Sequence, residues 1–101
     1  MKVIYSDQSL DSLQESLLFL LNDLGNPMKL VSEIKTHLLD RSESLAVNPQ
    51  IGQKEEFLEH LGKNHRRLIE GHFKIFYRIE DDMVYITDFF DTRQDPMKMN
   101  G

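Results

Sequence analysis

The stretch that decides the fold is HRRLIEGHFKIFYRIEDDMVYITDFF, residues 65–90. It contains three runs rich in Ile, Phe, Tyr and Val, which are residues that favour strands. Gly71 separates the first run from the second, and Asp81-Asp82 separates the second from the third, as in a tight hairpin. We therefore predict three consecutive antiparallel strands, at His65–Glu70, His72–Glu80 and Met83–Phe90.

Side chains along the middle strand alternate between two faces of the predicted sheet. The apolar face carries Phe73, Ile75, Tyr77 and Ile79. The opposite face carries His72, Lys74, Phe76, Arg78 and Glu80. We expect this second face to be a basic and aromatic binding surface, with Phe76 at its centre, unless the C-terminal tail covers it. In the last strand, Tyr85 and Phe89 alternate with Val84, Ile86 and Phe90, so both of its faces are apolar.

The first half of the chain predicts a short strand and two helices. Met1–Tyr5 is the strand, which we expect at the sheet edge, and Ser6 or Asp7 can cap the helix that follows. The apolar stripe of this helix has helical spacing and consists of Leu10, Leu13, Leu17, Leu20 and Leu24. Gly25-Asn26-Pro27 ends it, with Asn26 as the cap and Pro27 as the first residue of a second helix. That helix runs from about Met28 to Ser42 or Ser44, with Val31, Ile34 and Leu38 as its stripe.

The short connection makes the two helices an antiparallel hairpin, which covers the apolar face of the sheet. Asn48–Gly52 is a loop, and Phe57, Leu58 and Leu61 indicate one helical turn or an irregular cover. The predicted order is β-α-α-β-β-β, and the fold class is α+β. The length of 101 residues fits a single domain over residues 1–101.

Composition excludes several classes of protein. The chain has no cysteine, which excludes disulfide scaffolds and thiolate zinc sites. Its longest apolar run, Leu17–Leu21, is too short to span a bilayer, and Asp7 and Asp11 interrupt any secretory leader. We therefore expect a cytoplasmic protein with no membrane association. The four histidines show no metal-ligand spacing and no glycine-rich phosphate loop is present, so we expect no metal and no cofactor.

Charge is distributed unevenly around a net value of −5. Residues 1–62 hold five Lys and Arg against ten Asp and Glu, whereas residues 63–101 hold seven of each sign. The acidic total argues against non-specific binding of nucleic acid, which requires many cationic contacts with phosphate. The paired carboxylates Glu55-Glu56 and Asp81-Asp82 indicate exposed helix and turn positions rather than an acid–base dyad.

One group of cationic residues could form a binding or catalytic site. Arg66, Arg67, Lys74 and Arg93 come from neighbouring predicted strands, so they can converge to bind a phosphate or stabilise a phosphoryl transition state. Such a group cleaves RNA without a metal only if a general acid and base are supplied as well. The tail after Arg93, QDPMKMNG, contains neither tyrosine nor histidine.

The run HRRLIEGHFKIFYRI at residues 65–79 resembles the central signature of the RelE/ParE superfamily, and so does DFFDTRQDP at residues 88–96. NPQIG at residues 48–52 is similar to the superfamily's Pro-x-x-Gly loop. These proteins are the toxins of bacterial type II toxin–antitoxin modules, often described as plasmid stabilization proteins. The resemblance covers essentially the whole chain and implies a helical hairpin followed by an antiparallel sheet.

The resemblance implies one of two modes of action. In a RelE-like, ribosome-dependent mRNA endonuclease, Arg67 (or Arg66), Lys74 and Arg93 take the catalytic cationic positions. A ParE-like toxin instead binds DNA gyrase, and the missing tail tyrosine or histidine and the RQDP ending favour this branch. The expected target-binding or anion-binding residues are Arg66, Arg67, Lys74, Phe76, Arg78 and Arg93.

Either branch implies a cognate antitoxin and a toxin–antitoxin hetero-oligomer. The exposed apolar residues near the helical hairpin and the sheet edge would form the antitoxin's docking surface. A third reading is a degenerate, non-toxic member of the superfamily that binds only the antitoxin.

Overall fold

A computed structural model describes residues 1–94 and 97. Its elements are β1 (Lys2–Tyr5), α1 (Asp7–Leu18), the π-helical turn η1 (Phe19–Asp23), α2 (Met28–Ser44), β2 (Gln53–Lys54), the 3₁₀ helix η2 (Glu56–Leu61), β3 (Arg66–Glu70), β4 (Phe73–Glu80) and β5 (Met83–Asp91). The end of the RQDP motif, Asp95-Pro96, lies outside the described residues, as do residues 98–101.

The strands form one mixed sheet in the order β1-β5-β4-β3-β2. The β2–β3, β3–β4 and β4–β5 pairs are antiparallel, whereas β1 pairs with β5 in parallel at the sheet edge. The α+β prediction and the edge position of the first strand are therefore confirmed. The two-residue strand β2 was not predicted, because its sequence Gln53-Lys54 has no strand pattern.

The predicted hairpin between β4 and β5 is a two-residue turn. Asp81 and Asp82 both adopt left-handed backbone angles, with φ of 53° and 59°. Two consecutive residues with positive φ give the type I′ geometry that matches the twist of paired strands, and Asp tolerates it better than most non-glycine residues.

The helical hairpin follows the prediction at its start and differs from it at the end of the first helix. Ser6 caps α1, since its Oγ accepts a hydrogen bond from the Ser9 N–H at 3.0 Å. The helix then widens into η1, where the Leu24 N–H donates to the Phe19 carbonyl five residues back, at 3.1 Å. This wider turn rotates Leu24 off the stripe, which leaves it half exposed.

The loop between the helices corrects two further expectations. Gly25 has the expected left-handed conformation, with φ of 68°. Asn26, expected to cap the second helix, instead donates from Nδ2 to the Leu20 carbonyl of the preceding turn at 3.0 Å. Pro27 precedes α2 as its N-terminal cap residue and is not its first helical residue.

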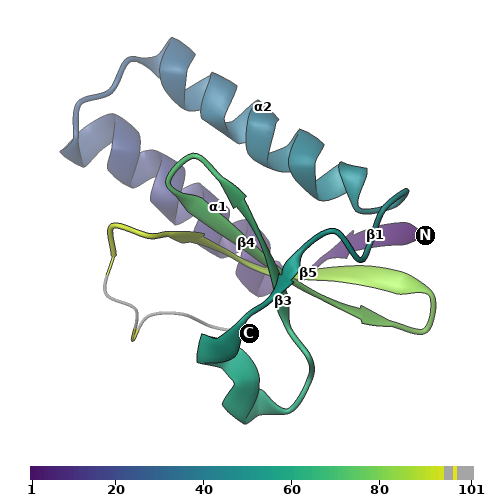
Figure 1. The fold of residues 1–101 in the computed structure, drawn as a ribbon. Coiled ribbons are helices and arrows are strands. Elements are labelled where there is room, and N and C mark those ends of the chain that lie inside the picture. Colours follow the sequence, from purple (N-terminus) through teal and green to yellow (C-terminus); the bar gives the residue numbers. More distant parts are fainter. Residues whose placement is uncertain (95–96, 98–101) are drawn as a thin grey trace.

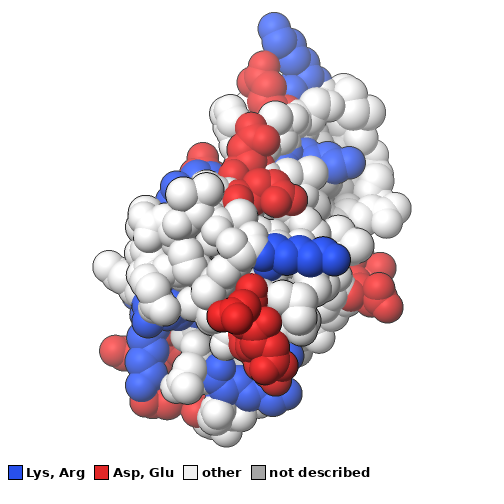
Figure 2. All heavy atoms as spheres, turned by 90° about the vertical axis from the view of Figure 1, so that its right-hand side faces the viewer, with Lys and Arg blue, Asp and Glu red and all other residues white. Residues whose placement is uncertain are grey.

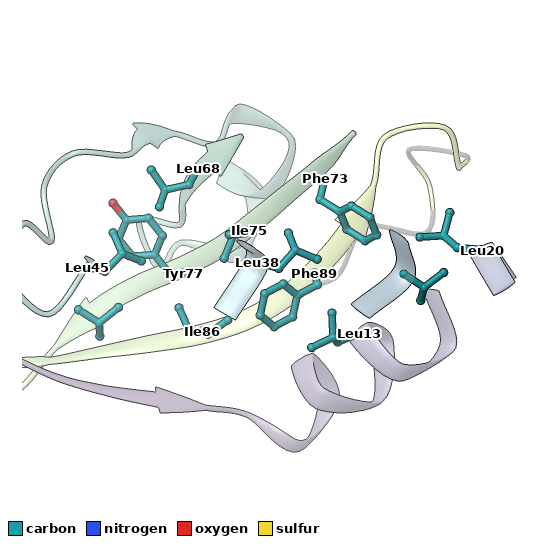
Figure 3. Packing of buried hydrophobic residues seen from close by; sticks show 12 residues of the cluster. Leu13, Leu20, Leu38, Leu45, Leu68, Phe73, Ile75, Tyr77, Ile86 and Phe89 are labelled. Carbon is teal, nitrogen blue, oxygen red and sulfur yellow. The ribbon is translucent and has the colours of Figure 1, made fainter. Parts of the chain in front are cut away.

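The main core lies between the helical hairpin and one face of the sheet (Figures 1 and 3). Leu13 and Leu20 come from the α1–η1 segment, Leu38 from α2, and Leu45 from the residue that follows α2. They pack against the predicted apolar face of β4, including Phe73, Ile75 and Tyr77. Ile79 is partly buried against the same cluster, so the prediction for this face of β4 is confirmed.

The prediction for the faces of β5 is wrong beyond Ile86. Phe76 pairs with Asp88 but Tyr77 pairs with Ile86, so Thr87 is an extra residue that forms a β-bulge. The bulge reverses the alternation that follows it. As a result Phe89 joins Ile86 in the main core, while Phe90 turns to the opposite face.

Candidate functional site

The face of the sheet opposite the helices is covered at its centre. Phe76 is fully buried and forms a second apolar cluster with Phe90 and with Leu58 of η2. The Phe76 and Phe90 ring centroids are 6.3 Å apart. In Figure 1 η2 lies on the side of the sheet opposite α1 and α2. The expectation of an open face centred on Phe76 is therefore wrong, because Phe57–Leu61 folds over it, and Phe76 itself does not reach the surface.

Beside this cover, Arg67 and Lys74 are brought together on one carboxylate. Oε2 of Glu55 lies 3.2 Å from Nη1 of Arg67 and 3.4 Å from Nζ of Lys74. The Glu55 side chain is only 3% exposed, so the expectation that Glu55 is an exposed residue is wrong. A single buried oxygen thus bridges both cations.

Arg67 makes further contacts that hold it to the β2 edge. Its Nη1 donates to the Lys54 carbonyl at 2.6 Å, and its Nη2 donates to Oε1 of Gln53 at 3.1 Å. Arg66, its neighbour, donates from Nη1 to the Gly52 carbonyl at 2.7 Å. Both guanidinium groups therefore fasten the loop and β2 to β3.

Arg93 lies next to its own buried acid. It donates from Nε and Nη2 to the two oxygens of Asp91, at 2.9 and 2.6 Å, and its backbone N–H also donates to Asp91 at 2.9 Å. Burial alone would raise the pKa of Asp91. The hydrogen bonds and the charge of Arg93 outweigh burial and hold that pKa below its usual range.

Arg78 lies farther along β4 from Lys74. Its guanidinium pairs with Glu80 and lies 4.7 Å from the centroid of the Tyr85 ring. Of the six residues expected in the site, the structure thus brings only Arg67 and Lys74 onto a common partner.

Glu55 and Asp91 are the residues that sequence reasoning missed. Nothing in the local sequence pattern distinguishes either carboxylate from an exposed one. For Glu55 the only signal is numerical: the stretch from Lys63 to Arg78 holds five bases and one acid, so counterions for these bases have to come from elsewhere in the chain.

A separate apolar groove runs between α1 and α2, on the helical hairpin. Its volume is about 620 Å³, and its lining includes Leu10, Leu18 and Met28, which are 46%, 47% and 62% exposed. Polar side chains in its lining include Gln14 and Lys35. The lining is therefore mainly apolar with a few polar side chains, which suits the apolar face of an amphipathic helix.

Other kinds of site are not evident within residues 1–94 and 97. In this part of the chain no group of three or more His, Asp or Glu side chains could hold a metal ion. No helix there is long and apolar enough to cross a bilayer. Figure 2 shows acidic and basic side chains interspersed over the face that it presents, without a large area of one sign.

Comparison with known proteins agrees with the fold and with the signature residues. No curated protein matches the sequence. The family model described as the ParE toxin of the type II toxin–antitoxin system, parDE, matches residues 3–96. This match covers nearly the whole chain, and it confirms the resemblance carried by residues 65–79 and 88–96. The chain therefore belongs to the ParE toxin family of type II toxin–antitoxin systems, and the partner that this membership implies is an antitoxin.

Proposed function

We propose that this protein is a ParE-like toxin that acts by binding DNA gyrase rather than by cleaving RNA. The observation that carries the proposal is the pairing of the candidate catalytic cations within the chain. Arg67 and Lys74 share the buried carboxylate of Glu55, and Arg93 is held by Asp91.

RNA cleavage by such cations requires them to stabilise the negative charge that develops on the phosphoryl group. Glu55 Oε2 occupies the space between Arg67 and Lys74 where a phosphate oxygen would have to bind. Displacing it would leave a buried carboxylate without its partners, which costs several kcal/mol, on the order of 3–5. This arrangement disfavours phosphodiester chemistry at Arg67 and Lys74.

The proposal is tested with the purified protein in two parallel reactions. We expect inhibition of gyrase supercoiling with accumulation of cleaved DNA, and no cleavage of mRNA on programmed ribosomes. Ribosome-dependent cleavage that is abolished in Lys74→Ala and Arg93→Ala, with gyrase unaffected, would establish the endonuclease reading instead. Normal growth on expression of the protein alone would establish the non-toxic reading.

We also propose that the antitoxin neutralises the protein by seating an amphipathic helix in the groove between α1 and α2. Support comes from the half-exposed leucines there and from the antitoxin partner that the family implies. Leu18→Glu introduces a charge into the groove and should weaken antitoxin binding at least about tenfold. Val47→Glu is the matched control, because Val47 is 91% exposed and lies outside the groove. Equal affinity of both variants would reject this docking site.

A further inference from the structure

A small pocket opens beside His65, on the part of the sheet's outer face beyond η2. Its volume is about 280 Å³, and it is lined by residues from five regions of the chain. These are Ser6 and Gln8 at the start of α1, Leu61 at the end of η2, Lys63 and His65 in the loop before β3, Arg78 in β4 and Thr87 in the bulge of β5. None of its lining residues belongs to the Glu55–Arg67–Lys74 group.

His65 is the feature that distinguishes this pocket from an ordinary surface hollow. Its side chain is 2% exposed, and neither Nδ1 nor Nε2 has a hydrogen-bond partner among the described residues. Leaving a buried imidazole without partners is unfavourable, and native proteins avoid it unless the group has a role. Both nitrogens are closed to solvent in this arrangement, so a ligand in the adjacent pocket supplies the missing acceptor only when the ring turns toward it.

The charges around the pocket determine the sign of that ligand. Lys63 and Arg78 are both cationic, and no carboxylate is among the residues that line the pocket. The counterion of Arg78 is Glu80, whose side chain is 54% exposed and does not line the pocket. The N-terminus of α1, a twelve-residue helix, adds the positive end of its dipole at Gln8.

Most neutral polar groups of the pocket already donate hydrogen bonds within the chain, so mainly the cations and His65 can donate to a ligand. The Ser6 hydroxyl and the Gln8 amide both donate to the Thr87 carbonyl, at 3.3 and 3.1 Å, and the Thr87 hydroxyl donates to the Phe76 carbonyl at 3.3 Å. These bonds fix the walls of the pocket. The remaining donors are the guanidinium of Arg78, the ammonium of Lys63, the imidazole of His65 and the second amide hydrogen of Gln8.

We propose that this pocket binds a small oxyanion of the phosphate class, either inorganic phosphate or a phosphate monoester, on Lys63, His65 and Arg78. The small volume suits one tetrahedral anion rather than an extended chain. A net charge of −5 repels a polyanion but has less effect on a single phosphate. The proposal is independent of whether gyrase is the target.

Binding has a specific consequence for the His65 ring. Burial, and then the charges of Arg78 and Lys63, hold the pKa of His65 below its usual value. An anion between these groups offsets the two cations and accepts from the ring, so His65 gains a proton more readily when phosphate is bound. The nitrogen signals of its imidazole therefore report binding directly.

The experiment is an NMR titration of the 101-residue chain with inorganic phosphate at constant ionic strength, and in parallel with a nucleoside 5′-monophosphate. We expect saturable shifts of the His65 ring and of the Gln8 and Lys63 amides. Lys63→Gln should weaken binding about tenfold or more, since it removes one charge-assisted bond. Lys29→Gln removes the same charge from the exposed surface of α2 and should leave binding unchanged.

The two ligands distinguish the sources of the phosphate group. Tighter binding of the nucleoside monophosphate identifies an ester as the ligand, and equal or weaker binding identifies free phosphate. Absence of saturable shifts at His65, or equal weakening in Lys63→Gln and Lys29→Gln, would overturn the proposal. Because Lys63 is exposed, its substitution leaves the core intact, and the test requires no substitution of the buried His65.

Discussion

Tyr77 joins the core to the loop at residues 49–52 through a single oxygen. Its ring is fully buried beneath the helices, while its hydroxyl donates to the Pro49 carbonyl at 2.7 Å and accepts from the Gly52 N–H at 2.9 Å. A Cβ at residue 52 would lie 2.4 Å from that hydroxyl oxygen and 2.7 Å from the Arg67 carbonyl. The glycine of the Pro-x-x-Gly loop is thus required by close approach.

Tyr77→Phe tests this attachment. The substitution leaves the ring but removes both hydrogen bonds, so a buried N–H and a carbonyl lose their partner. We expect a loss of about 1–3 kcal/mol in the free energy of unfolding, measured by urea denaturation. Tyr85→Phe is the matched control. It also removes only a tyrosine hydroxyl, and the ring keeps its contact with the Arg78 guanidinium. The same loss in both variants would contradict the role of the loop contact.

Asp91 predicts an acid-sensitive contribution to stability. Its pKa is below the ordinary value of 3.8 when folded, so the unfolded chain takes up the proton first as the pH falls. The stabilisation is therefore present above that value and is lost as the pH falls through the folded pKa. Arg93→Gln should destabilise the protein near neutral pH, and its difference from the wild type should shrink in acid. Urea titrations across this range measure both, and a difference independent of pH would exclude the mechanism.

At the scale of elements, η2 is the segment whose role the sequence conceals. Leu58 is 2% exposed and seals Phe76 and Phe90, whereas Leu61 in the same helix is 41% exposed. Leu58→Ala should cost about 2–5 kcal/mol, because it removes buried methyl groups and leaves a cavity. Leu61→Ala should cost much less. Thermal and urea unfolding of the two variants measure these losses of stability. Equal losses would mean that η2 does not seal the cluster.

The elements themselves follow from sequence pattern, but the faces of the sheet do so only in part. The strong β runs predict β3, β4 and β5 to within one residue at their ends. The rule that side chains alternate between the two faces then fails at Thr87. A bulge residue cannot be recognised from composition, and it reverses the face of every side chain after it. The sequence also left open whether anything covers Phe76, since this depends on how η2 packs against the sheet.

At the scale of the whole molecule, charge pairing separates what sequence can predict from what it cannot. Arg67 and Lys74 were identified as candidates, and the register places them near each other. Their common partner, Glu55, lies 12 and 19 positions earlier in the chain, so only the tertiary fold brings it there. The signature residues were sufficient to identify the family, whereas the ion pairs made by its cationic residues could not be predicted from them.

Glu55→Gln tests this balance of charge. Removing the bridging carboxylate leaves two cations that are 22% and 20% exposed, without their shared counterion. We expect a gain in affinity for a single-stranded oligonucleotide that falls steeply with salt, measured by fluorescence anisotropy. Glu56→Gln makes the same change of net charge at an exposed position and should gain far less. Equal gains would show that net charge, and not the bridge, governs binding.

The parallel pairing of β1 with β5 also has a consequence for synthesis. The N-terminal strand has to wait for Met83–Asp91 as its neighbour, and β4 requires the same segment on its own flank. A nascent chain therefore cannot complete its sheet until Met83–Asp91 has been translated. We expect copies released before this segment to lack the strand that pairs with both β1 and β4, and therefore to be degraded rather than folded.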